Sequence, residues 1–109
     1  MKTVIKIENP GDPDYTRNFP PFTKTDNESA FFAQYNRNKL GMTLNLKNAE
    51  GKKTLKHLVK KADILIENFR PGAMNGLGLG YEDLKKENPA LVYTSISGFG
   101  QTGPKSSRP

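Results

Sequence analysis

Cysteine is absent from the 109 residues of this chain, and histidine occurs once, as His57. The lack of cysteine excludes a disulfide-stabilised module and a metal site with thiolate ligands. With a single histidine, a histidine-rich metal centre is equally disfavoured, so we expect no metal. Hydrophobic residues make up only 34% of the chain. A chain of this size with so little apolar content can build only a marginal core.

Long apolar runs are also missing. No stretch approaches the ~20 residues that a membrane helix requires, and the N-terminal segment lacks the apolar core of a secretory signal. We therefore expect a cytoplasmic protein. Basic residues are in excess, with 17 Lys and Arg against 11 Asp and Glu, a net charge of +6. This charge is compatible with nucleic acid, a membrane surface or a phosphate-bearing ligand, and does not choose among them.

Short apolar runs and one periodic segment define the expected elements. Strands are predicted at residues 4–7, 42–46, 64–66 and 91–97, and helices at residues 28–35, 48–61, from Pro71 onward and 81–87. A loop rich in proline is predicted at residues 9–27. The clearest helix has Asn48 as its cap and an apolar stripe with helical spacing, formed by Leu55, Leu58, Val59 and Ala62.

The alternation of strands and helices predicts an α/β protein with a parallel, Rossmann-like sheet and flanking helices. The continuous apolar run at residues 64–66 is typical of a strand covered on both faces of such a sheet. No further element is predicted before the first strand, and an open loop follows the last one. We therefore expect residues 1–109 to be one partial domain of a larger sheet, truncated at both ends, with apolar faces left bare.

Ligands of parallel α/β sheets bind beyond the carboxyl ends of the strands. Lys47 and Arg70 follow two of the predicted strands, and free N–H groups at helix N-termini there can bind phosphate oxygens. Each basic residue could also be an ordinary surface residue, and residues 68–72 could be a simple turn. The lysines between Lys52 and Lys61 are interpreted as a solvated helix face, and His57 as a surface residue.

No arrangement of nucleophile and base is visible, so no catalytic residue is assigned. Ser95 and Ser97 lie on the last predicted strand, and the only histidine belongs to another element. The glycines at residues 76–80 follow a helix and have the wrong spacing for a dinucleotide-binding motif. From the residues alone, the chain is predicted to form the ligand-binding edge of a parallel sheet.

At these same residues the chain resembles the family III CoA-transferases, which include formyl-CoA transferase and carnitine CoA-transferases, with α-methylacyl-CoA racemase as a relative. The matching stretches are residues 4–12, 36–39, 62–72 and 95–104, of which the segments ENFRPG and SGFGQTGP are the most specific. The resemblance implies a Rossmann-like large domain in two interlocked chains. It also implies a much longer enzyme, in which a catalytic aspartate beyond this chain attacks the acyl-CoA.

The resemblance further implies which residues contact coenzyme A. The implied contacts are Leu44, Lys47, Asn68, Phe69, Arg70 and Leu77. Lys47 and Arg70 would face the phosphates, and Leu44 and Phe69 would offer apolar walls. Two departures weaken the phosphate contacts, because Gly76 and Asn9 stand where relatives carry basic residues.

The function implied is transfer of CoA between an acyl-CoA and a free carboxylic acid, through an aspartyl intermediate and without a metal. Asn68 favours a transferase over an acyl-CoA racemase, in which proline tends to precede the phenylalanine. A non-catalytic basic binding module is the alternative of another class. Aromatic residues do not alternate with the basic ones as nucleic-acid stacking requires. We expect an acyl-CoA and a small acid as partners, no nucleic acid or membrane, an interlocked homodimer at full length, and an isolated chain without activity.

Overall fold

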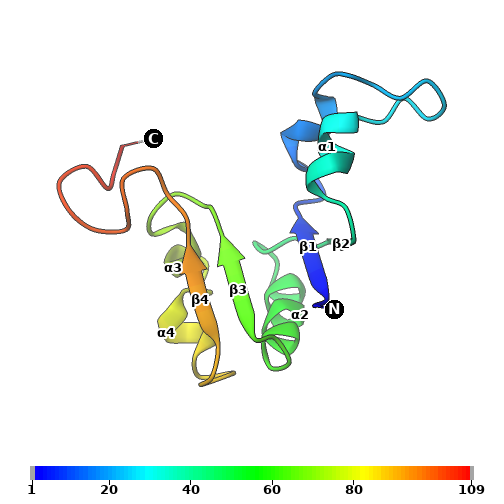
Figure 1. Cartoon of the computed structure of the whole chain (residues 1–109). Helices are drawn as coiled ribbons and strands as arrows, with labels where there is room; N and C mark the ends of the chain where they lie inside the picture. Colours follow the sequence, from blue (N-terminus) through cyan, green and yellow to red (C-terminus); the bar gives the residue numbers. More distant parts are fainter. Residues whose placement is uncertain (1, 109) are drawn as a thin grey trace. The chain divides into compact units, whose positions relative to one another are not determined.

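The computed structural model describes residues 2–108 and divides into two compact units, Met1–Asn45 and Leu46–Pro109. Unit 1 contains β1 (Val4–Glu8), the 3-10 helix η1 (Tyr15–Asn18), α1 (Ala30–Tyr35) and β2 (Lys39–Thr43). Unit 2 contains α2 (Ala49–Val59), β3 (Ile64–Glu67), α3 (Ala73–Gly76), α4 (Tyr81–Leu84) and β4 (Val92–Ser95) (Figure 1). This mixture of strands and helices confirms the α/β class.

The strands form two parallel pairs. β1 pairs with β2, and β3 pairs with β4, each pair being a separate two-stranded sheet. Parallel strands need a crossover connection because no tight turn can join them. Helix α1 lies in the first crossover, and α3 and α4 lie in the second. The predicted parallel pairing is confirmed within each pair.

The second strand begins earlier than the alternation of apolar residues predicted. The prediction was residues 42–46, whereas β2 spans Lys39–Thr43. Its position follows from the register with β1, in which Val4 lies opposite Lys39 and Glu8 lies opposite Thr43. The alternation continues past Thr43, but β1 ends at Glu8. Only one further bond, from the Leu44 N–H to the Glu8 carbonyl, extends the pairing.

Two predicted helix boundaries also need correction. Pro71 does not begin a helix, because Gly72 at the N-cap of α3 adopts a left-handed conformation with a φ of 83°. Helix α4 ends at Leu84 instead of Glu87. After Leu84 the chain continues in a turn, in which the Glu87 N–H donates to the Leu84 carbonyl at 3.0 Å. The Asn88 Nδ2 then donates to the carbonyls of Val59 and Ala62 at 3.0 and 2.8 Å.

Helix α2 and the second crossover supply the core of unit 2. The Asn48 side chain accepts a hydrogen bond from the Glu50 N–H and caps α2, as predicted. The buried apolar residues are Leu55, Val59, Met74, Leu79, Leu84 and Leu91. Leu79 and Leu84 have no exposed surface. Within residues 2–108, no helix is long and apolar enough to cross a membrane.

Several apolar residues of β3 and β4 are largely exposed. Ile64 is 58% exposed, Ile66 65% and Val92 56%, and Ile64 lies opposite Val92 in the register. The run at residues 64–66 is therefore not covered on both faces within this chain. This exposure agrees with the expectation that apolar faces of the strands are left bare.

Unit 1 is organised around charged side chains. Arg17 Nη2 and Nε donate to the two carboxylate oxygens of Glu8 at 2.7 and 3.1 Å. Lys6 forms an ion pair with Asp14 and donates to Asn36 Oδ1 at 2.9 Å. The Arg17 guanidinium lies 3.9 Å from the centroid of the Phe32 ring. Among residues 2–45, only Ser29 is fully buried, so this network takes the place of an apolar core.

The network lowers the pKa of both carboxyl groups. The hydrogen bond from Arg17 is the main cause for Glu8, whose pKa falls from 4.5 to about 2. Burial alone would raise the pKa of Asp14, but hydrogen bonds from Lys6 and Thr16 outweigh burial and lower it from 3.8 to about 2. A carboxyl group with a lowered folded-state pKa stabilises the fold above its unfolded-state pKa. That stabilisation is lost as the pH falls through the folded-state pKa.

We predict that Glu8→Gln lowers the free energy of unfolding at neutral pH. The expected loss is roughly 1 kcal/mol, at the low end for a charged hydrogen bond because Arg17 is half exposed and its charge is screened. The difference between wild type and variant should shrink as the pH falls from 4.5 to about 2, where Glu8 becomes protonated. Urea unfolding followed by circular dichroism measures it.

Glu82→Gln is the matched control, because the side chain of Glu82 is 74% exposed and pairs only with Lys85 among the described residues. This variant should leave the pH dependence unchanged. A difference between wild type and Glu8→Gln that persists at about pH 2 would contradict the role of the ionised carboxylate.

Candidate functional site

The carboxyl ends of β3 and β4 form one edge of unit 2. Glu67 lies opposite Ser95 in the register, and the Ile96 N–H donates to the Glu67 carbonyl at 2.8 Å. The segments that follow, residues 68–72 and residues 96–103, therefore leave the sheet at the same edge, as the parallel arrows of β3 and β4 in Figure 1 show. This is the edge at which parallel α/β proteins bind ligands.

Three of the predicted contact residues project from this edge. Asn68, Phe69 and Arg70 are exposed, and Phe69 retains 46% of its accessible surface. Within the described residues, the Arg70 side chain makes no ion pair or hydrogen bond. A guanidinium group in that condition can bind phosphate through two parallel hydrogen bonds. The ring of Phe69 offers a flat apolar surface to the same ligand.

The backbone at residues 69–73 is fixed at both ends. The Phe69 N–H donates to Glu67 Oε2 at 2.8 Å, and the Ala73 N–H donates to the Arg70 carbonyl at 3.0 Å. The second bond leads into α3, whose N-cap Gly72 has a φ of 83° that favours glycine. The exposed side chains are thus carried by an ordered loop.

Leu44 and Lys47 lie in different units. Leu44 follows β2 in unit 1, where it is half-buried and its N–H bonds to the carbonyl of Glu8. Lys47 lies in unit 2, exposed in the turn before the Asn48 cap of α2. Because β2 ends at Thr43, Leu44 lies just after the strand and not within it as predicted, and Lys47 lies in the turn before α2 instead of directly after the strand.

Leu77 and Gly76 lie at the end of α3. Leu77 is the C-cap, is half-buried, and donates its N–H to the carbonyls of Ala73 and Met74. It belongs to the same unit as residues 68–70, at the opposite end of α3. A Cβ placed on Gly76 would meet no atom within 4 Å, and its φ is not positive. The structure therefore does not require glycine there, and a basic side chain would fit.

Gly80 differs from Gly76 because a side chain there would require the Asn75 side chain to move. A Cβ at Gly80 would lie 1.7 Å from Asn75 Oδ1. This glycine and Gly78, which has a φ of 72°, explain the glycine-rich segment at residues 76–80 by local packing and conformation.

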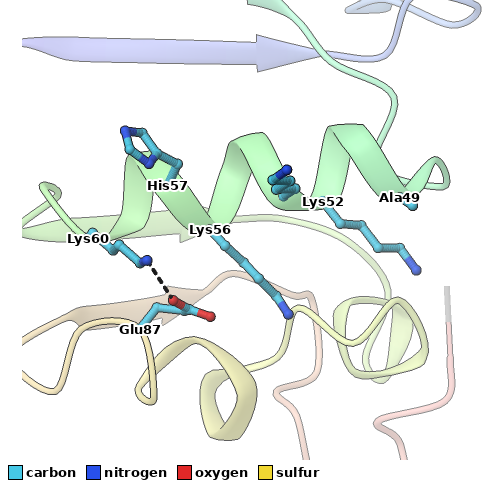
Figure 2. A pocket seen from close by; sticks show the side chains of 7 residues that line it. Ala49, Lys52, Lys56, His57, Lys60 and Glu87 are labelled. Atoms are coloured by element: carbon cyan, nitrogen blue, oxygen red, sulfur yellow. Dashed lines mark ion pairs between the residues drawn. The ribbon is translucent and has the colours of Figure 1, made fainter.

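The lysine face of α2 surrounds an open hollow (Figure 2). Its lining residues are Ala49, Lys52, Lys53, Lys56, His57, Lys60 and Glu87. Lys60 Nζ lies 3.5 Å from Glu87 Oε2, and Lys53, His57 and Lys60 are exposed. No aromatic ring lines the hollow, so stacking with nucleic-acid bases has no platform there. The lysine face is a solvated helix surface, as predicted.

Glu67, the last residue of β3, and Tyr93, which lies opposite Leu65 on β4, were not assigned as site residues from the sequence. Burial is the main cause that raises the pKa of Tyr93 to about 12, and the negative charge of Glu67 adds to it. The Tyr93 hydroxyl lies 3.4 Å from the carbonyl oxygen of Leu79. An acidic residue between an apolar run and a turn is the sequence signal that could have identified Glu67.

The arrangement offers groups for binding but no centre for chemistry. Within residues 2–108, no three His, Asp or Glu side chains are grouped as metal ligands. The exposed guanidinium, amide and aromatic ring at residues 68–70 are suited to a ligand that carries phosphates and an apolar or aromatic part.

Known proteins are similar to this chain in fold and in sequence. The chain is similar to a crystal structure of a Mycobacterium tuberculosis protein, with a TM-score of 0.87 and 37% identity over 98% of this chain and 30% of that one. It is also similar to a CAIB/BAIF family protein from Brucella suis, with a TM-score of 0.87 and 41% identity over 97% of this chain and 29% of the other.

Curated relatives match at comparable levels. Acetyl-CoA:oxalate CoA-transferase of Acetobacter aceti is 50% identical over 93% of this chain and 25% of its own length. Succinyl-CoA:glutarate CoA-transferase of Mus musculus is 46% identical over 96% of this chain and 24% of its own length. The chain thus spans about a quarter of the length of these relatives. The family model described as CoA-transferase family III matches residues 3–109, and the chain therefore belongs to that family.

Proposed function

We propose that this chain is part of the CoA-binding domain of a longer enzyme that moves CoA between an acyl-CoA and a free carboxylic acid. The observation that carries the proposal is the family match over residues 3–109, whose strand-end edge bears exposed groups suited to CoA. The transfer passes through an aspartyl intermediate, and its aspartate is contributed by another part of the enzyme. The metal-free character of this chemistry is part of the proposal.

The residues at the strand-end edge fit the parts of CoA. Arg70 binds phosphate oxygens, since its guanidinium has no partner among residues 2–108. Phe69 contacts the adenine or the pantetheine chain, and Asn68 supplies hydrogen bonds. Leu44, Lys47 and Leu77 are proposed as further contacts on the strength of the family resemblance. Lys47 is supported by its position directly before the capped N-terminus of α2.

The substrates are proposed from the names of the relatives. Those relatives act on acetyl-CoA with oxalate and on succinyl-CoA with glutarate, as their names state. We propose that this enzyme likewise pairs an acyl-CoA with a small carboxylic acid. The interlocked homodimer, the cytoplasmic location and the absence of nucleic-acid and membrane partners belong to the same proposal.

The reaction can be tested in the full-length enzyme with an acyl-CoA and a panel of free acids. We expect new CoA esters that depend on the added acid, detected by mass spectrometry. Exchange of the α-proton of the acyl-CoA with solvent, without any acid requirement, would instead indicate a racemase. If neither CoA transfer nor α-proton exchange is detected, the proposal that the protein is an enzyme is overturned.

We predict that Arg70→Ala and Lys47→Ala each weaken CoA binding to the full-length enzyme. The expected loss is roughly 1–3 kcal/mol, the range for removing a charged hydrogen bond. Lys56→Ala is the matched control, because Lys56 belongs to the lysine face of α2 and not to the strand-end edge. Titration calorimetry measures all three. Equal losses at the three positions would favour diffuse electrostatic attraction over a defined site.

We predict that Gly76→Arg strengthens CoA binding, because the resemblance has a basic residue there and the site has room for one. The expected gain is about 1 kcal/mol, the net worth of one hydrogen bond. Gly76→Ala is the control: both variants should raise the melting temperature, since glycine disfavours helix by roughly 0.5–1 kcal/mol. Only Gly76→Arg should improve binding. A gain shared equally by Gly76→Ala would trace the effect to helix stability.

A further inference from the structure

Glu67 joins the strand pair to the loop that carries the predicted CoA contacts. Its carbonyl accepts from the Ile96 N–H at 2.8 Å, which anchors the residue to the end of β4. Its side chain turns to the next segment, where Oε2 accepts from the Phe69 N–H at 2.8 Å. One residue therefore bonds to the sheet through its backbone and to the loop through its carboxylate.

The side chains of the loop have no such support of their own. Among residues 2–108, the side chains of Asn68, Phe69 and Arg70 make no hydrogen bond or ion pair with other residues. Their directions depend on the backbone, which is held by the carboxylate of Glu67 at one end and by the Ala73 N–H at the other. Loss of either bond frees residues that a ligand would then have to order at an entropic cost.

The negative charge of Glu67 makes its position informative. A carboxylate beside a phosphate site opposes the binding of an anion, so its charge is unfavourable for the ligand itself. The same charge strengthens the hydrogen bond to the Phe69 amide, because bonds to ionised acceptors are the stronger ones. The carboxylate therefore supports the loop and does not attract the ligand. Its negative charge should weaken anion binding, whereas its hydrogen bond to the Phe69 N–H should strengthen it.

We propose that Glu67 is a positioning residue, whose carboxylate holds the Phe69 amide and thereby presents residues 68–70 to the CoA portion of the substrate. This inference rests on the proposed function, in which that edge binds acyl-CoA. Glu67 does not touch the reacting atoms. Its contribution is to the affinity for acyl-CoA, so it should appear in KM and leave kcat nearly unchanged.

The test compares three substitutions of Glu67 in the full-length enzyme, with steady-state kinetics against acyl-CoA at saturating acid. Glu67→Leu removes the acceptor and should raise KM about tenfold, while Glu67→Gln keeps an oxygen acceptor and should stay within about twofold of wild type. Glu67→Asp keeps the charge and an acceptor that can reach the N–H two residues on, as Asp14 and Asn48 do in this chain, so its KM should also stay within about twofold of wild type. Glu82→Ala, an exposed acid elsewhere in unit 2, is the control with unchanged KM.

If Glu67→Leu does not fold, Glu67→Ala replaces it as the variant without an acceptor. A KM for Glu67→Gln or Glu67→Asp that rises as far as that of the acceptor-free variant overturns the proposal, as does a wild-type KM for the acceptor-free variant. Equal falls in kcat and rises in KM, accompanied by a lower melting temperature, would mean that Glu67 only supports the fold. If Arg70→Ala also leaves KM unchanged, the CoA site is not at this edge and the proposed assignment of the site fails as well. A response to Arg70→Ala alone overturns only the role of Glu67.

Discussion

The parallel pairing of β3 with β4 is the constraint on which unit 2 depends. Because parallel strands cannot be joined by a short turn, the chain must cross over between them, and that crossover contains α3 and α4. Met74, Leu79 and Leu84 in the crossover are buried in the core. The same pairing brings both strand ends to one edge, where residues 68–70 are exposed. The buried crossover and the exposed strand-end edge are therefore two results of one pairing.

Unit 1 reaches order by a different route. Its strands also pair in parallel, but its side-chain contacts are dominated by the ion pairs of Lys6 with Asp14 and of Glu8 with Arg17. The core of unit 2 consists instead of aliphatic side chains and a methionine. Lys6 and Glu8 are two apart on β1 and so extend from the same face of the strand. Networks of this kind contribute more than isolated surface pairs do, and their geometry is more specific than that of an apolar cluster.

Local sequence signals predicted the elements whose causes are local. Helix α2 could be predicted because the Asn48 cap and the apolar stripe both lie within its own residues, and β1 and β3 were recognisable as short apolar runs. The errors arose where distant residues decide. The register with β1 sets the limits of β2, and the bonds of Asn88 to Val59 and Ala62 accompany the early end of α4. For the site, the sequence predicted residues 68–70 but gave no indication of the bond between Glu67 and Phe69.

Among residues 2–108 the Arg70 side chain has no ion-pair partner, and this has a consequence for how an anion would replace solvent there. A guanidinium group without an internal carboxylate partner is neutralised by water and by mobile ions from the buffer. An anion that binds there displaces those ions and does not have to break a salt bridge within the protein. The affinity for such an anion should therefore fall as the ionic strength rises, and binding should need little rearrangement of the Arg70 side chain.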